Sequence, residues 1–106
     1  MKQFVVVGLG RFGVSVATTL AENGHDVLAI DRDPEKVQAI SGDVTHAVEA
    51  DATDEEALKT LGVRNFDVAV VSIGDNVSAN ILCTLILKEL GVPYVIVKAP
   101  DKLPSL

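Results

Sequence analysis

Short apolar runs and amphipathic stretches alternate along the chain, and this alternation predicts strands followed by helices. Most of the runs are continuously apolar and rich in β-branched residues, as in parallel strands that are buried on both faces. One run, His46–Glu49, is more polar, and we place it at the edge of the sheet. The five predicted strands are Phe4–Val7, Val27–Ile30, His46–Glu49, Val68–Val71 and Tyr94–Val97.

Four stretches between these strands carry the signals of helices. Asp33 and Pro34 suit the N-cap and the first helical position, while Thr53 and Glu56 have the spacing of a capping box. Glycines that follow the helical patterns predict where the helices stop. The predicted helices run from about Arg11 to Glu22, from Asp33-Pro34 onward, from Thr53 to Gly62, and from Val77 to Leu90.

The alternation with short links predicts right-handed βαβ units and therefore a parallel sheet. We expect an α/β, Rossmann-like domain with five strands in the order 3-2-1-4-5 and helices on both faces. A chain of 106 residues is long enough for one domain. We assign residues 1–98 to a nucleotide-binding Rossmann domain and residues 99–106, with two of the four prolines, to a tail.

Composition narrows the classes of partner. The net charge is −6 without any block of Lys or Arg, so nucleic acid is a poor candidate partner. No apolar run approaches the roughly 20 residues that span a bilayer, so direct membrane insertion is not expected. The single Cys83 suits a reducing cytoplasm, and within its helix it is expected to be a buried structural thiol. Neither His25, expected to be solvated, nor His46 has the spacing of a transition-metal ligand.

The stretch "FVVVGLGRFG" has three glycines at G-x-G-x-x-G spacing directly after a predicted strand and before a helix. In the dinucleotide-binding fold Gly8 permits the tight turn, Gly10 lets the backbone approach a phosphate, and Gly13 lets the helix pack closely on the sheet. The unpaired N–H groups at the start of the helix attract an anion. The alternative is a tight turn that holds no ligand.

Acidic residues follow the next two strands. Asp31 lies 18 residues after Gly13, where its carboxylate would accept hydrogen bonds from ribose hydroxyls and repel the 2′-phosphate of NADP. Asp51 and Ala52 are expected on the adenine side of the cleft, although Asp51 has the alternative role of helping to cap the following helix. The stretch Ser72–Asn76 is expected to line the opposite wall.

The chain has no nucleophile–base pair, no Tyr-x-x-x-Lys pattern and no acid–base dyad, so we predict that it is not an enzyme. One alternative is the NAD-binding half of an oxidoreductase whose catalytic domain is missing. Another is a structural assembly module with a vestigial cleft.

Five stretches together resemble the RCK domain, also called KTN or TrkA-N: "GLGRFG", "LAIDRDPEKV", "EADATDEEAL", "VVSIGDNVSANILCTLILKELGV" and "VIVKA". The similarity is strongest to the cytoplasmic regulatory subunit of Ktr and Trk potassium-uptake systems. It implies a domain that senses ATP, ADP or NAD(H) and gates a membrane potassium channel or transporter through an oligomeric assembly. It also implies a location in the cytoplasm, at the inner face of the membrane through the pore subunit.

The resemblance also implies roles for two basic residues. Arg11 matches an arginine of the glycine loop that reaches terminal phosphates, and Lys98 matches a basic position near them; solvated side chains are the alternatives. The sequence leaves open whether a magnesium ion binds through the nucleotide phosphates. The predicted nucleotide-binding residues are Gly8, Leu9, Gly10, Arg11, Phe12, Gly13, Asp31, Arg32, Asp51, Ala52, Ser72, Ile73, Gly74 and Lys98.

Full RCK domains continue with another helix, a sixth strand and a crossover helix, and residues 99–106 do not continue that pattern. We therefore expect either a truncated piece of a longer protein or a minimal natural form that lacks the sixth strand and the C-terminal half.

The helix at Val77–Leu90 is apolar over more of its circumference than one sheet can bury. We predict a homodimer that pairs this helix, which could assemble further into a ring, with Leu82 and Ile86 as the expected contacts.

Overall fold

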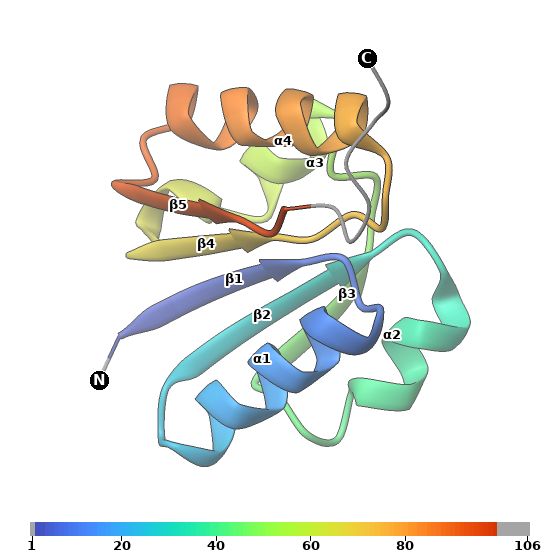
Figure 1. Cartoon of the computed structure of the whole chain (residues 1–106). Coiled ribbons are helices and arrows are strands. Elements are labelled where there is room, and N and C mark those ends of the chain that lie inside the picture. The colour runs from blue at the N-terminus through green and yellow to red at the C-terminus, as the bar shows by residue number, and fades with distance from the viewer. Residues whose placement is uncertain (1, 100–106) are drawn as a thin grey trace.

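A computed structural model describes residues 2–99, and in it all strands are parallel. The sheet has the order β3-β2-β1-β4-β5, which confirms the predicted topology (Figure 1). Apart from residue 99, the predicted tail lies outside the described residues. The strands are β1 (Gln3–Val7), β2 (Asp26–Asp31), β3 (His46–Glu49), β4 (Val68–Val71) and β5 (Tyr94–Val97).

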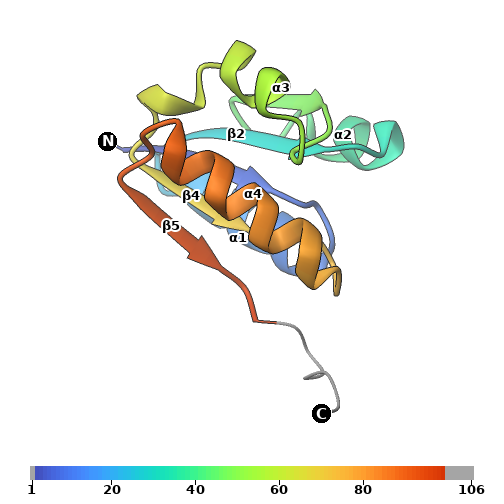
Figure 2. The same ribbon diagram turned by 90° about the horizontal axis from the view of Figure 1, so that it is seen from above.

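Helices cover both faces of the sheet, as predicted. Figure 1 shows α3 and α4 on one face and α1 and α2 on the other, and Figure 2 shows α4 lying along β4 and β5. One element was not predicted: Gly62, at φ +73°, leads into a single 3-10 turn, η1 (Val63–Asn65). The helices are α1 (Arg11–Glu22), α2 (Pro34–Ile40), α3 (Glu55–Thr60) and α4 (Val77–Glu89).

The core has two aliphatic layers, one on each face of the sheet. Successive residues of a strand point to opposite faces, so each buried strand contributes to both layers. Val5, Val7 and Ile30 pack under α3 and α4 with Leu58 and Leu87. β3 is only half-buried, which confirms its place at the edge.

The helix caps agree with the sequence in one place and differ in another. Asp33 caps α2, and its carboxylate accepts a hydrogen bond from the N–H of Glu35 at 2.9 Å, as expected. The capping box predicted for Thr53 and Glu56 is wrong, because Asp54 caps α3 and accepts from the N–H of Glu56 at 3.0 Å. The Thr53 hydroxyl donates to the carboxylate of Asp51.

The outer face of α4 is apolar and exposed, but it differs from the predicted contact surface. Ile86 is only 8% exposed and packs in the core, so its assignment to the dimer interface is wrong. Ile86 lies three residues after Cys83 and next to Leu87, which places it on the stripe that faces the sheet. The large apolar residues left exposed on this helix are Val77, Ile81, Leu82 and Leu85, and we call them the α4 stripe.

Candidate functional site

The cleft lies where β1 and β4 end side by side. The chain leaves β1 toward α1 on one face and leaves β4 toward α4 on the other, so the two loops separate at this point. In an open parallel sheet, ligands bind at such a switch point, outside the carboxyl ends of the strands. The loops stay joined at their base, since the N–H of Ser72 donates to the Val7 carbonyl at 2.8 Å.

The three glycines of the loop meet three different surroundings. Gly8 has φ +93°, and a Cβ there would lie 2.1 Å from the Ser72 carbonyl oxygen. A Cβ at Gly13 would lie 1.7 Å from the Gly8 carbonyl oxygen. A Cβ at Gly10 would meet no described atom within 4 Å. Packing within the protein therefore requires Gly8 and Gly13, whereas Gly10 leaves open space above the loop.

The first turn of α1 is not capped by a side chain. Its N-cap is Gly10, and the turn carries no acidic residue. The helices α2, α3 and α4 are each capped by a side chain, namely Asp33, Asp54 and Asn76. The N–H groups at the start of α1 and the positive end of its dipole therefore face the cleft without an internal acceptor.

Asp31 connects β2 to the glycine loop. Its Oδ2 atom accepts a hydrogen bond from the Leu9 N–H at 2.8 Å, and its Oδ1 atom accepts one from the Asp33 N–H at 2.8 Å. Each carboxylate oxygen has a further lone pair. Asp31 can thus hold the loop in place and still accept a hydrogen bond from a ligand hydroxyl.

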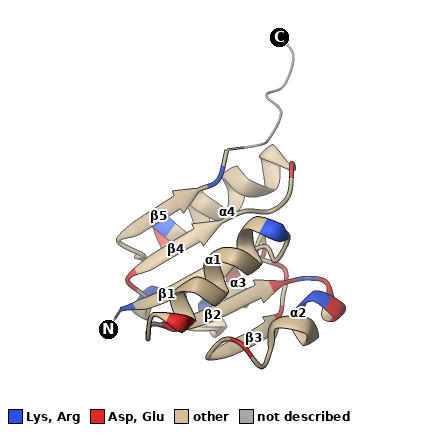
Figure 3. Ribbon diagram, turned by 60° about the horizontal axis from the view of Figure 1, so that its bottom comes forward, with Lys and Arg blue, Asp and Glu red and all other residues tan. Residues whose placement is uncertain are grey.

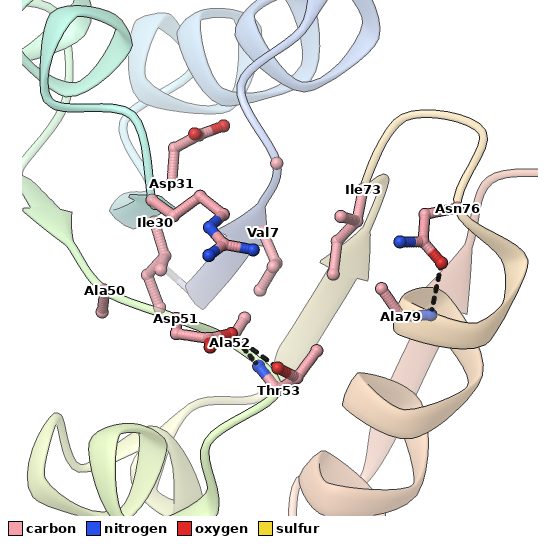
Figure 4. A pocket seen from close by; sticks show the side chains of 12 residues that line it. Val7, Ile30, Asp31, Ala50, Asp51, Ala52, Thr53, Ile73, Asn76 and Ala79 are labelled. Atoms are coloured by element: carbon pink, nitrogen blue, oxygen red, sulfur yellow. Dashed lines mark hydrogen bonds between the residues drawn. The ribbon is translucent and has the colours of Figure 1, made fainter.

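One pocket lies between β2, the segment after β3 and the first turn of α4. Figure 4 shows Ile30, Asp31 and Ala50 on one side and Ile73, Asn76 and Ala79 on the other. Half of its lining residues are aliphatic, as suits the face of a heterocyclic base. Its lining residues are Val7, Gly8, Ile30, Asp31, Arg32, Ala50, Asp51, Ala52, Thr53, Ile73, Asn76 and Ala79.

Asp51 contributes a fixed anion to this pocket. Its Oδ1 atom accepts hydrogen bonds from the Thr53 hydroxyl at 2.6 Å and from the Thr53 N–H at 2.9 Å. These bonds, together with the charge of Arg32, lower the pKa of Asp51. The carboxylate is therefore ionised at neutral pH and presents only acceptors.

A second pocket lies on the other side of the glycine loop, between the start of α1 and the end of β5. It holds the cations Arg11 and Lys98, and Figure 3 shows basic residues at these two points of the carboxyl edge. The Lys98 Nζ atom lies 5.7 Å from the centroid of the Phe12 ring and donates to the Ala99 carbonyl at 3.1 Å. Its lining residues are Gly10, Arg11, Phe12, Gly13, Ser15, Ser72, Gly74, Asp75 and Lys98.

Thirteen of the fourteen residues predicted from the sequence line one of these two pockets. The exception is Leu9, whose side chain is buried in the core and whose N–H is bound to Asp31. Sequence reasoning missed several lining residues. Asn76 was not among them, because the stretch Ser72–Asn76 was expected to line this wall. The small or apolar ones, Val7, Ile30, Ala50 and Ala79, carried no signal in the sequence.

Two other candidate groups, Cys83 and His25, contact other residues of the fold. Cys83 is buried, as expected, and burial next to the charge of Asp51 raises its pKa to about 12, so the thiol is protonated at neutral pH. His25 is not simply solvated as predicted, because its ring packs against Phe4 and its Nδ1 atom accepts from the Lys2 N–H. Within residues 2–99, no three His, Cys, Asp or Glu side chains gather as a metal site would need.

The parallel sheet, its strand order and the glycine loop at the switch point define a Rossmann-like domain. The chain belongs to the TrkA-N domain family, whose model matches residues 4–103. This membership confirms the resemblance inferred from the motifs.

Relatives in the same family are potassium-uptake proteins. The chain is 54% identical over 100 residues to Ktr system potassium uptake protein C of Bacillus subtilis, which covers 94% of this chain and 45% of that protein. It is 45% identical over 101 residues to Ktr system potassium uptake protein A of Vibrio alginolyticus, covering 95% of this chain and 46% of that protein. The chain thus spans less than half the length of these relatives.

A solved structure has the same fold. The NAD(P)-binding domain of an exopolyphosphatase-related protein from Archaeoglobus fulgidus superposes with a TM-score of 0.79 at 28% identity, over 92% of this chain and 72% of that one.

Among the described helices, none has the length and apolar content to cross a bilayer.

Proposed function

We propose that this chain is a regulatory domain of a potassium-uptake system and that it binds an adenine nucleotide, ATP, ADP or NAD(H), in the cleft of its sheet. The observation that carries the proposal is the open space above Gly10, directly in front of the uncapped first turn of α1. Backbone N–H groups and a helix dipole that point into an open space form an anion site of the kind that binds phosphates.

The two pockets fit the two ends of such a nucleotide. The aliphatic pocket beside Asp31 suits an adenosine, with its base between Ala52 and Ile73 and its ribose hydroxyls on the Asp31 carboxylate. The basic pocket, with Arg11 and Lys98, suits the phosphates that follow. A magnesium ion would enter with the phosphates and would need few ligands from the protein.

Binding rather than chemistry is the proposed task. The only cysteine is a protonated, buried thiol. The Thr53 hydroxyl is bonded to the Asp51 carboxylate, but the lowered pKa of Asp51 makes that carboxylate a weak base. The names of the relatives support a role in potassium uptake. We propose that a membrane potassium channel or transporter subunit is the partner, that the chain acts at the cytoplasmic face, and that nucleotide binding alters an assembly of this domain.

The direct test is calorimetry of the purified chain with ATP, ADP, NAD, NADH and NADP. We expect saturable binding of adenine nucleotides, with NADP weaker than NAD because the charge of Asp31 repels a 2′-phosphate. Failure of all five to bind would contradict the proposal. A hydride transfer by the chain with NADH would favour the oxidoreductase alternative.

Asp31→Ala is expected to weaken nucleotide binding by about 1.5–3 kcal/mol, because hydrogen bonds from ribose hydroxyls to a charged acceptor are lost. The loss of the Leu9 contact is expected to lower the free energy of unfolding as well. Calorimetry and denaturant titration separate the two effects. Asp26→Ala removes the same charge from the opposite end of β2 and should leave affinity unchanged. An unaltered affinity in Asp31→Ala would remove Asp31 from the site.

Arg11→Ala is expected to weaken ATP more than ADP, by a difference of about 1–3 kcal/mol, because a charge-assisted contact to the terminal phosphate is lost. Parallel titrations with ATP and ADP measure the difference. Arg64→Ala, which removes a positive charge from η1, serves as the control. Equal weakening of both nucleotides would leave Arg11 without a role in reading the third phosphate.

A further inference from the structure

Two polar side chains are buried among the described residues, Ser72 and Asn80, and both hold the loop that follows β4. Asn80, in the first turns of α4, is 8% exposed. Its Oδ1 atom accepts from the Ile73 N–H at 2.8 Å. Its Nδ2 atom donates to the Asn76 carbonyl at 2.9 Å and to the Ile73 carbonyl at 3.3 Å.

The loop that Asn80 holds belongs to both pockets. Ile73 and Asn76 line the pocket beside Asp31, while Gly74 and Asp75 line the basic pocket. The other end of the loop is fixed by Ser72, whose hydroxyl lies 3.2 Å from the carbonyls of Val7 and Gly8. Asn80 is therefore the side chain that fixes the far part of this wall.

We propose that Asn80 is a positioning residue for nucleotide binding, one that sets the wall 73–76 in its binding geometry without touching the nucleotide. The inference rests on the proposed function. A loop that is already held in the bound geometry loses less conformational entropy when the ligand arrives, and this raises affinity. Asn80 itself is absent from both pocket linings, so its effect on the ligand passes through Ile73 and Asn76.

The chemistry of the amide makes the proposal testable. Asn80 uses one acceptor and two donors at once, and an ionised carboxylate of the same shape offers acceptors only. In Asn80→Asp, the oxygen that replaces Nδ2 faces two carbonyl oxygens, so the loop is repelled while the carboxylate is ionised. Burial and this repulsion raise the pKa of the new carboxyl. When it is protonated at lower pH, it becomes a donor again.

The experiment compares nucleotide affinity of the wild type, Asn80→Asp and Asn76→Asp by calorimetry with ADP, from pH 8 to pH 5. Asn76→Asp makes the same charge change in the same loop, but an aspartate can still cap α4 by accepting from the Ala79 N–H. At pH 8 we expect Asn80→Asp to bind on the order of tenfold or more weakly than Asn76→Asp. The difference should narrow toward pH 5.

The ADP affinity of the wild type at each pH is the reference, because it corrects for the titration of groups that all three proteins share. Equal affinities for the two variants at pH 8, or a difference that does not change with pH, would overturn the proposal. Asn80→Ala is the second variant if Asn80→Asp does not fold at pH 8. It removes the three bonds without adding charge, and it should weaken ADP to the same extent at every pH.

Amide hydrogen exchange separates this proposal from the proposed function. The Ile73 N–H should exchange faster in Asn80→Asp than in Asn76→Asp at pH 8, because its acceptor group is repelled from the loop. Unchanged exchange at Ile73 would overturn the positioning role. The wild type could bind no nucleotide while Ile73 still exchanges faster in Asn80→Asp than in Asn76→Asp. That result would contradict the proposed nucleotide binding and leave Asn80 only the role of holding the loop.

Discussion

Gly13→Ala is expected to unfold the domain or to destabilise it by more than about 3 kcal/mol, a large share of the stability of a domain of this size. The new Cβ would lie 1.7 Å from the Gly8 carbonyl oxygen, a backbone atom that cannot rotate away. Relief would require α1 to move off the sheet and would expose the aliphatic layer beneath it.

Gly10→Ala is the matched control, because the same methyl group enters open space three residues earlier. Gly10 has φ −76°, which alanine adopts without strain, so the loss should be about 0.5–1 kcal/mol from the poorer N-cap. Nucleotide binding should nevertheless be lost, since the methyl group would occupy the space proposed for a phosphate.

Denaturant unfolding and calorimetry of the two variants give opposite expected results. Gly13→Ala should have a much lower free energy of unfolding than the wild type. Gly10→Ala should keep most of that free energy and lose only nucleotide binding. A stable Gly13→Ala domain would contradict the close packing of α1 on the glycine loop. Wild-type affinity in Gly10→Ala would remove the phosphate from its proposed place.

Leu85→Glu is expected to convert a dimer into a monomer without loss of stability. Leu85 is 60% exposed and belongs to the α4 stripe, so a charge there stays in water in the monomer but would be buried without a partner in a dimer. Light scattering should give about twice the monomer mass of 11.2 kDa for the wild type and that mass itself for the variant.

Ile86→Glu, the adjacent substitution, is expected to act differently. Ile86 is buried in the core, so the charge should lower the free energy of unfolding by several kcal/mol rather than separate the subunits. A stable, monomeric Ile86→Glu would contradict the orientation of α4. A wild type that is monomeric at tens of micromolar would contradict the α4 dimer, and a dimeric Leu85→Glu would move the interface to another surface.

The contrast between Leu85 and Ile86 shows where sequence reasoning ended. Nearly the whole circumference of α4 is apolar, so periodicity alone did not identify the face that packs on the sheet. The position of Cys83 and Leu87 against the strands determines that face, and it places Ile86 inside. The capping error at Thr53 has a similar origin, because two adjacent residues could both cap the helix, and only the folded structure shows that the Asp54 carboxylate accepts from the Glu56 N–H.

The sequence by itself determined the order of the elements, the parallel sheet and the glycine loop, because these depend on local periodicity, on caps and on backbone conformations that neighbouring residues impose. Tertiary structure decided which partners each polar group has. The Leu9 N–H reaches Asp31 across 22 residues, and the Ser72 hydroxyl reaches Gly8 across 64. Such contacts depend on how separate strands come together, and no local pattern in the chain encodes the distance between them.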